Sequence, residues 1–344
     1  MTRCAPAVLA IVAACGQGHE PAAPPAPAPA PSAALAAGTA ASGGAGASGG
    51  SAAHGSDGAA APASGDGFTC EPLSFAATTP VPEASGAAWL TVDGKLVLLV
   101  VGDSGNAGAY GLIDPDTGAT IETGALPLSD EASDDIEGVS ARGDRIYGIT
   151  SSGWIRTWRR IAGGFELTDK PYPLGPIDLP DTKNNDRAPR GDGMVCNGRV
   201  VNCGRNYEGL CLAPAPPSRD CIGFAASKAD GHVYCLTESA GKLAVHHDRA
   251  IAIARPGTVA DCAFNDDGSL WVGNNMFDLG RVYRVTHWDT PATAHVERVA
   301  ALPLGFPETL AVRGDVVYRM SDTSVPGARF YRFRAEFHAF AVAR

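Results

Sequence analysis

The sequence lacks the features that mark nucleic-acid-binding and membrane-spanning proteins. Its 344 residues carry 27 Lys and Arg against 37 Asp and Glu, a formal net charge of −10, with no cluster of basic residues. Because neutralising phosphates needs clustered Lys and Arg, we expect no nucleic-acid partner. No apolar run reaches the roughly 18 residues that a membrane-spanning helix needs. Aromatic residues (7%) and charged residues (19%) are also scarce, because Ala, Gly and Pro crowd into one stretch.

The first fifteen residues have the order of a bacterial export signal. Arg3 supplies a positive charge, and Ala5–Ala14 form a short apolar segment. Val12-Ala13-Ala14-Cys15 then resembles the lipobox of bacterial lipoproteins, in which an aliphatic residue and two small residues precede a cysteine. The resemblance implies that residues 1–14 are removed and that Cys15 carries lipid, which would hold the protein on a membrane. The expected location is the cell envelope, at the outer membrane or cell surface, and an ordinary signal peptide is the alternative.

Residues 15–66 predict a spacer that begins at the lipid-bearing cysteine. Of the 51 residues from 16 to 66, 43 are Ala, Gly, Pro or Ser, and none is Lys or Arg. Such a segment has too little apolar surface to offset the entropy that it would lose on ordering. Alternating Pro and Ala at 21–31 favour polyproline II, and the Gly- and Ser-rich part beyond is flexible. We therefore expect a disordered tether that presents one folded domain, residues 67–344.

The folded domain is expected to be all-β and built from repeats. Long helical periodicity is absent, and short β-rich runs recur with Gly, Asp and Asn turns between them. Each unit has a strand, a tight turn, a second strand, a polar loop and a third strand. Residues 160–191 read as an insertion over one face. The units begin near Ser85, Ile136, Gly193, Asp220, Asp261 and Glu308, of which the unit at Gly193 is the weakest.

The spacing of these units favours a β-propeller. Propeller blades take about 40–50 residues each, which predicts six blades, with five or seven as alternatives. A large β-sandwich is the rival fold, but it would lack the regular Asp/Gly turn after every first strand. The starts Ile136-Glu137-Gly138-Val139 and Tyr207-Glu208-Gly209-Leu210 resemble those of phytase-like esterase and NHL-like six-bladed propellers. That group mixes hydrolases with binding scaffolds, so the resemblance implies a fold more than an activity.

Seven cysteines remain once Cys4 and Cys15 are set aside. Six of them lie within 67 residues, and export favours their pairing as disulfides that staple the third and fourth units. The odd number leaves at least one unpaired within the chain. We favour a bond between Cys211 and Cys221 across a Pro-rich loop, and no short Cys-x₂₋₄-Cys spacing indicates zinc. The disulfide candidates are Cys196, Cys203, Cys211, Cys221, Cys235 and Cys262.

Acidic residues recur where first strands begin, and these strands line the channel of a propeller. Their N-terminal ends open on the same face as the loops between second and third strands. Converging carboxylates in a low dielectric repel one another, so they raise their pKa values or bind a cation, and oxygen-only ligands suit Ca²⁺. The candidate metal ligands are Glu137, Glu208, Asp261, Glu308 and Asn275. The loops of this face are expected to hold further polar residues, among them Asp103, Ser151, Glu238, Asn275 and Asp322.

A structural role is the alternative to metal binding for the same acids. A carboxylate at a strand start can accept backbone N–H groups of the neighbouring blade and so close the ring without a ligand. An analogy at the level of the fold points the other way, because calcium-dependent lactonase-like propellers surround one metal with Glu, Asn and Asp. The analogy implies a set made of Glu137, Asn275 and Asp261.

These observations favour a lipid-anchored binding or scaffold module, monomeric, that takes an unidentified protein or small-molecule ligand. A divalent cation, with Ca²⁺ as the best fit, is expected at the channel mouth. The alternative is a calcium-dependent hydrolase of esters, lactones or phosphoesters that uses the carboxylate rim. Phosphate would need basic residues at the mouth, for which Arg142, Arg145 and Arg187 are candidates. The sequence identifies no catalytic set.

Overall fold

Antiparallel β-sheets form nearly all of the regular secondary structure in the described residues. The computed structural model describes residues 70–76, 78–177, 193–216, 220–275, 280–302, 307–320 and 337–342, all within the compact unit Ala59–Arg344. These residues contain one short 3-10 helix, η1 (Pro291–Thr293). Cys15, the predicted signal and the predicted spacer lie outside the described residues. In the part of the chain that is described, no helix has the length and apolar character needed to cross a membrane.

The strands form five sheets, and each sheet is a blade of a propeller. The first blade contains β2 (Ala84–Val92), β3 (Lys95–Gly102), β4 (Ala109–Ile113) and β5 (Thr120–Ala125). The second contains β6 (Gly138–Arg142), β7 (Arg145–Ile149), β8 (Trp154–Ile161) and β10 (Tyr172–Pro173), with β9 (Gly164–Leu167) also paired to β8. The third contains β11 (Tyr207–Leu212), β12 (Gly223–Ser227), β13 (His232–Ser239) and β14 (Lys242–Ala252).

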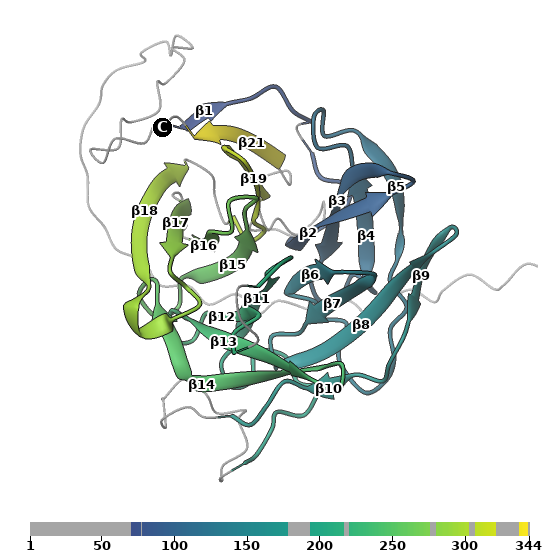
Figure 1. Cartoon of the computed structure of the whole chain (residues 1–344). Helices are drawn as coiled ribbons and strands as arrows, with labels where there is room; N and C mark the ends of the chain where they lie inside the picture. Colours follow the sequence, from purple (N-terminus) through teal and green to yellow (C-terminus); the bar gives the residue numbers. More distant parts are fainter. Residues whose placement is uncertain are drawn as a thin grey trace, which may run out of the picture. The chain divides into compact units, whose positions relative to one another are not determined.

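The last two blades complete a ring around a central axis. The fourth contains β15 (Val259–Phe264), β16 (Leu270–Asn274), β17 (Gly280–Thr286) and β18 (His295–Leu302). The fifth contains β19 (Ala311–Arg313), β20 (Val316–Met320), β21 (Phe337–Val342) and β1 (Cys70–Pro72). The innermost strands β2, β6, β11, β15 and β19 surround the axis, and each contacts the next (Figure 1). The all-β propeller expected from the sequence is confirmed.

The ring is closed by strands from the two ends of the domain. β1 pairs antiparallel with β21, with Cys70 opposite Val342. The fifth blade therefore combines the first and the last described strands of the chain.

The described residues form five blades where six were favoured. The units that begin near Gly193 and Asp220 share one sheet, because β11 is its innermost strand and β12 pairs beside it as the second strand. The segment from Gly193 to Asn206 has no strand and leads into β11. The sequence interpretation had placed Asp220 at the start of a first strand, which shifted every element of this blade by one position.

Glycines allow the innermost strands to approach closely where the acids lie. A Cβ on Gly138 would lie 2.6 Å from the Leu210 nitrogen and 2.7 Å from the Gly209 Cα. A Cβ on Gly209 would in turn lie 2.8 Å from Asp261 Oδ1. Real Cβ atoms do not approach other atoms so closely, so packing requires glycine directly after Glu137 and directly after Glu208. Five clusters of buried apolar residues fill the spaces between neighbouring blades.

All six candidate cysteines are paired, but not as favoured from the sequence. Cys211 bonds to Cys262, joining the innermost strands of the third and fourth blades, so the expected bond between Cys211 and Cys221 is wrong. The reason is that β11 and β15 are neighbouring innermost strands, which brings the Cα atoms of Cys211 and Cys262 to 5.7 Å, whereas Cys221 pairs with Cys235 of its own blade. The three bonds indicate an oxidising, extracytoplasmic location. They are Cys196–Cys203, Cys211–Cys262 and Cys221–Cys235.

Candidate metal centre

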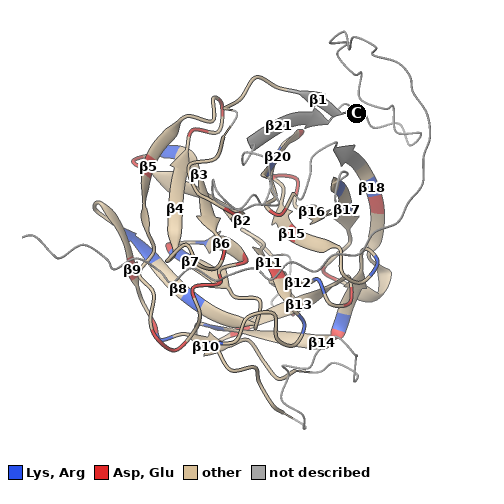
Figure 2. Cartoon of the chain, turned by 180° about the vertical axis from the view of Figure 1, so that it is seen from behind, with Lys and Arg blue, Asp and Glu red and all other residues tan. Residues whose placement is uncertain are grey.

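The innermost strands place their acids at one end of the central channel. Glu137 directly precedes β6, Glu208 is the second residue of β11, and Glu308 precedes β19. In β11 the pairing register shifts between Tyr207 and Gly209, so Glu208 sits in a bulge. A bulge bends the strand and redirects a side chain, and bulges are frequent beside functional sites. Figure 2 shows acidic residues near the centre of the ring, where these strands begin.

Five carboxylates converge there in two overlapping groups. The first group is Glu137, Glu208 and Glu308, and in each group one ligand atom per residue lies within 4.8 Å of the others. The second group is Asp103, Asp135 and Glu137. Glu137 therefore belongs to both groups and lies between them. The three glutamates of the first group are buried, with exposed fractions of 5%, 4% and 8% in chain order.

One ammonium group and one amide contact the first group. Lys228 Nζ donates to Glu208 Oε2 at 2.9 Å and lies 3.5 Å from Glu308 Oε1. Asn275 Nδ2 donates to Glu308 Oε1 at 2.7 Å, so its carbonyl oxygen is not the atom that faces this acid. Lys228 follows β12 and Asn275 follows β16, so both occupy loops between second and third strands. The structure thus brings four of the five candidate ligands together and adds a lysine.

In the second group, Asp135 is hydrogen-bonded to Ser151 of the second blade, and Asp103 comes from the first blade. Asp135 Oδ2 accepts the Ser151 backbone N–H at 3.1 Å and also the Ser151 hydroxyl. Asp103 follows β3, and one of its oxygens accepts the Ser104 N–H. Asp135 is 2% exposed, whereas Asp103 is only partly buried. Asp103 is therefore the acid of this group that a ligand in the channel mouth could reach most easily.

The electrostatics of this cluster favour protons or a cation. Burial raises the pKa of Glu137 well above its usual range, and the neighbouring acids, first of all Glu208, raise it further. Burial also raises the pKa of Glu208, although Lys228 opposes the shift. The pKa of Asp103 is raised to about 7, chiefly by burial. Burial disfavours the charged form of Lys228, but Glu208 and Glu308 outweigh it, so the pKa of this lysine is raised.

Asp261 lies apart from both groups and has a different role. Its Oδ1 accepts the Cys262 N–H at 2.7 Å, and its Oδ2 accepts the Leu310 N–H of the fifth blade at 2.8 Å. The side chain is 1% exposed. Both oxygens are thus used by backbone donors, one of them across the boundary between blades. This is the ring-closing arrangement weighed as the structural alternative, and it applies to Asp261 alone among the five candidates.

Two buried arginines support the segments that carry the acids. Arg319, which is fully buried, donates through Nη2 to the carbonyl of Pro307, next to Glu308, and to that of Asn274, next to Asn275. In the second blade, Arg156 Nη2 donates to the carbonyl of Ala132 at 2.7 Å, three residues before Asp135. These arginines act through the backbone and do not face the channel as ligands.

The sequence interpretation missed Lys228 because it misassigned one blade. With β12 taken as a first strand, residues 228–231 were read as a hairpin turn rather than as a loop on the acidic face. The same error placed Glu238 on this face, whereas Glu238 forms an ion pair at 2.8 Å with Arg142, at the far end of β6. In the corrected repeat Lys228 directly follows the second strand of its blade, as Asp103 and Asn275 do in theirs, and this alignment is the signal that would have found it. Asp322 lies outside the described residues.

Comparisons with known proteins find only distant likenesses to solved structures. No family model and no curated protein matches the sequence. The PQQ-bound aldose sugar dehydrogenase of Streptomyces coelicolor is similar at 16% identity and a TM-score of 0.48, over 80% of this chain and 98% of that chain. Myxococcus xanthus glutaminyl cyclase is similar at 12% identity and a TM-score of 0.45, over 80% and 97%. A luciferin-regenerating enzyme is similar at 11% identity and a TM-score of 0.46, over 81% and 96%.

Proposed function

We propose that this chain is an exported, lipid-anchored binding propeller that holds a divalent cation, Ca²⁺, at the acidic mouth of its channel. The observation that supports it best is the convergence of Glu137, Glu208 and Glu308, three buried carboxylates with ligand atoms within 4.8 Å of one another. Oxygen ligands are those that Ca²⁺ takes in proteins. His and Cys, which would favour zinc, take no part in either group among the described residues.

Charge supports a cation more than a purely structural cluster. A structural carboxylate has its oxygens occupied by backbone donors, as those of Asp261 are. The five clustered acids share one ammonium group, that of Lys228, which contacts Glu208 and Glu308. Among the described residues, Glu137, Asp103 and Asp135 form no such ion pair, because the two that the cluster makes are those of Lys228 with Glu208 and Glu308. A cation between the two groups would oppose both causes of the raised pKa of Glu137, which are its burial and the repulsion of its neighbouring acids.

Thermal unfolding of the whole chain with and without metal tests the proposal. After treatment with EDTA, added Ca²⁺ is expected to raise the free energy of unfolding by about 2.7 kcal/mol at one hundred times its Kd. Glu137→Gln is expected to abolish this rise, because it removes the charge shared by both groups. Glu166→Gln is the matched control and should leave the rise unchanged, because Glu166 lies in β9 with a side chain 41% exposed and pairs with Arg159.

Two results would refute the cation site. One is a midpoint of unfolding that no divalent ion shifts. The other is an equal response of Glu137→Gln and Glu166→Gln to Ca²⁺, which would mean that the ion acts elsewhere on the surface. Mass spectrometry of the native chain would count the bound ions directly.

A second candidate function, hydrolysis, is favoured by Asp103. Its pKa of about 7 suits a general base at neutral pH, and it lies partly exposed beside the proposed cation. A metal-bound ester or lactone carbonyl would be the substrate group, with the cation polarising its oxygen. Phosphoesters fit less well, because Arg142 and Arg145 lie at the opposite ends of their strands from Glu137. Arg187 lies outside the described residues.

Asp103→Asn separates the two functions. If the protein is a hydrolase, this variant should lose at least about a hundredfold in kcat on ester or lactone substrates, the usual contribution of a general base. It should keep most of the stabilisation by Ca²⁺, because the three glutamates remain. Asp116→Asn, at an exposed turn, is the control. Failure of the native protein to turn over any ester or lactone while it binds Ca²⁺ would leave the binding function and exclude this hydrolase.

A further inference from the structure

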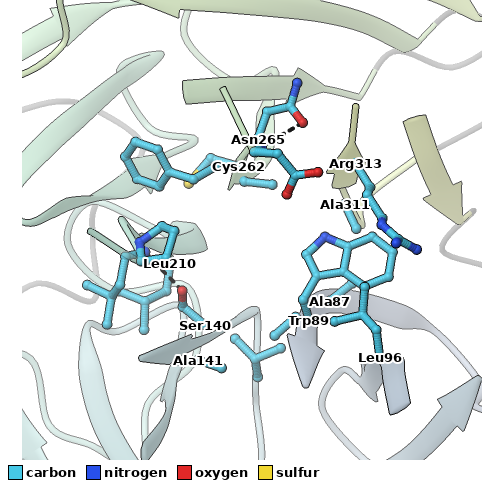
Figure 3. Close-up of a pocket in the computed structure, with 17 residues that line it drawn as sticks. Ala87, Trp89, Leu96, Ser140, Ala141, Leu210, Cys262, Asn265, Ala311 and Arg313 are labelled. Atoms are coloured by element: carbon cyan, nitrogen blue, oxygen red, sulfur yellow. Dashed lines mark hydrogen bonds between the residues drawn. The ribbon is translucent and has the colours of Figure 1, made fainter. Parts of the chain in front are cut away.

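A pocket lies at the end of the channel opposite the acids. It has a volume of about 230 Å³ and is lined by residues from all five innermost strands. The lining residues lie toward the C-terminal ends of these strands and in the turns that follow, away from the ends that carry the acids. They include Ala87 of β2 and Arg313 of β19 (Figure 3). It is smaller than the roughly 300–1,000 Å³ of pockets for drug-sized ligands, so its occupant is small.

Much of the lining of this pocket is apolar. Trp89, Leu96, Val139, Leu212 and Phe264 all line it. Several polar atoms in the lining are already engaged within the protein. Trp89 Nε1 donates to the Val312 carbonyl at 3.0 Å, and the Leu212 N–H donates to the Ser140 hydroxyl at 2.9 Å. These groups leave an apolar surface that is suited to a hydrocarbon side chain.

Two opposite charges stand at the rim of the pocket. Arg313 and Asp266 both line it and are both exposed. Neither side chain forms a hydrogen bond or ion pair with any other described residue, and they are not within 4.0 Å of each other. Figure 3 shows the Arg313 side chain extending toward Trp89. The pocket therefore offers one cation and one anion, separately, beside an apolar surface.

We propose that this pocket binds a small zwitterion with an apolar side chain, of the α-amino-acid type. The planar guanidinium of Arg313 would receive the carboxylate, since arginine and carboxylate form paired, charge-assisted hydrogen bonds. Asp266 would accept hydrogen bonds from the ammonium group, and the side chain would lie on Trp89 and Leu212. A simple carboxylate would leave Asp266 unmatched, and a simple amine would leave Arg313 unmatched. This site is independent of the proposed cation at the other end of the channel.

Calorimetric titration of the whole chain tests the charge requirement. The probes are L-leucine, 4-methylpentanoate, which lacks the amine, and 3-methylbutylamine, which lacks the carboxylate. L-leucine is expected to bind at least about tenfold more tightly than either analogue, because each lost contact is a charge-assisted hydrogen bond. EDTA should not change its affinity. The proposal is overturned if L-leucine shows no binding up to about 10 mM, or if either analogue binds as tightly as L-leucine.

Variants locate the site. Arg313→Gln and Asp266→Asn are each expected to weaken L-leucine binding by about tenfold. With Arg313→Gln, L-leucine should bind no more tightly than 3-methylbutylamine. With Asp266→Asn, L-leucine should bind no more tightly than 4-methylpentanoate. Asp315→Asn, at an exposed turn residue next to the Arg313 strand and outside the lining, is the matched control. Ala141→Leu fills the pocket while keeping both charges, and undiminished binding by this folded variant would place the ligand elsewhere and refute the proposal.

Discussion

At the scale of single residues, Lys228 controls the charge of the acidic mouth. Its ammonium group contacts Glu208 at 2.9 Å and Glu308 at 3.5 Å, where a divalent cation would also have to sit. Lys228→Met is therefore expected to destabilise the metal-free protein and to strengthen Ca²⁺ binding by about tenfold, equal to about 1.4 kcal/mol. Calorimetric titration with Ca²⁺ and chemical unfolding measure the two effects. Lys170→Met, at a lysine with an 88% exposed side chain, is the control. Weaker Ca²⁺ binding by Lys228→Met would mean that the lysine positions the glutamates instead.

At the scale of elements, the contact between β6 and β11 brings Glu137 and Glu208 together. Gly138→Ala would place a Cβ 2.6 Å from the Leu210 nitrogen, so the strands must separate. We expect a loss of about 1–3 kcal/mol in the free energy of unfolding, typical of overpacking, together with weaker stabilisation by Ca²⁺. Urea unfolding with and without the ion measures both. Gly164→Ala in β9, whose added Cβ would meet no atom within 4 Å, should change little. An equal response of the two variants would contradict the close-approach argument.

At the scale of the whole molecule, the buried acids make stability depend on pH in an unusual direction. The pKa values of Asp103, Asp135, Glu137 and Glu208 are raised, so the folded protein binds more protons than the unfolded chain above pH about 4. Stability then falls as pH rises through the folded pKa values, which for Asp103 is about 7. We expect the metal-free protein to unfold at a higher temperature at pH 5 than at pH 8, and Ca²⁺ to stabilise it more at pH 8.

Two acids nearer the surface, Glu122 and Asp267, show that the pH dependence between pH 5 and pH 8 comes from the buried acids. The pKa of Glu122 is lowered by its hydrogen bond to Arg160, against the effect of burial. Burial would raise the pKa of Asp267, but its hydrogen bonds and its ion pair with Arg284 outweigh burial and lower it. The stabilisation from both acids is lost only as pH falls through these lowered pKa values. The interval from pH 5 to pH 8 therefore reports the raised acids. Glu137→Gln should flatten the dependence, as measured by thermal unfolding in EDTA. A metal-free protein whose stability rises across this interval would contradict the assignment.

The sequence by itself determined the class of fold and the face on which the acids lie. Alternating β-rich runs and Asp/Gly turns are local signals, so the strands and their order along the chain could be predicted. The Ile136-Glu137-Gly138-Val139 start identified one channel-lining strand, and the structure shows that glycine is required there and at Gly209 because the strands approach too closely for a Cβ. The six cysteines that pair were also predicted, since export and clustering are compositional properties.

Only the tertiary structure decided which of these residues meet. The choice of β11 over β12 as the innermost strand of the third blade depends on packing against β6 and β15, which no local pattern encodes. That choice brings Lys228 to the acidic mouth, directs Cys211 to Cys262 and separates Asp261 from the three glutamates. Closure of the ring by β1 and β21 joins the two ends of the domain. Contacts of such long sequence separation depend on the global arrangement of blades, and this is why the channel mouth, unlike its strands, could not be assembled from the sequence.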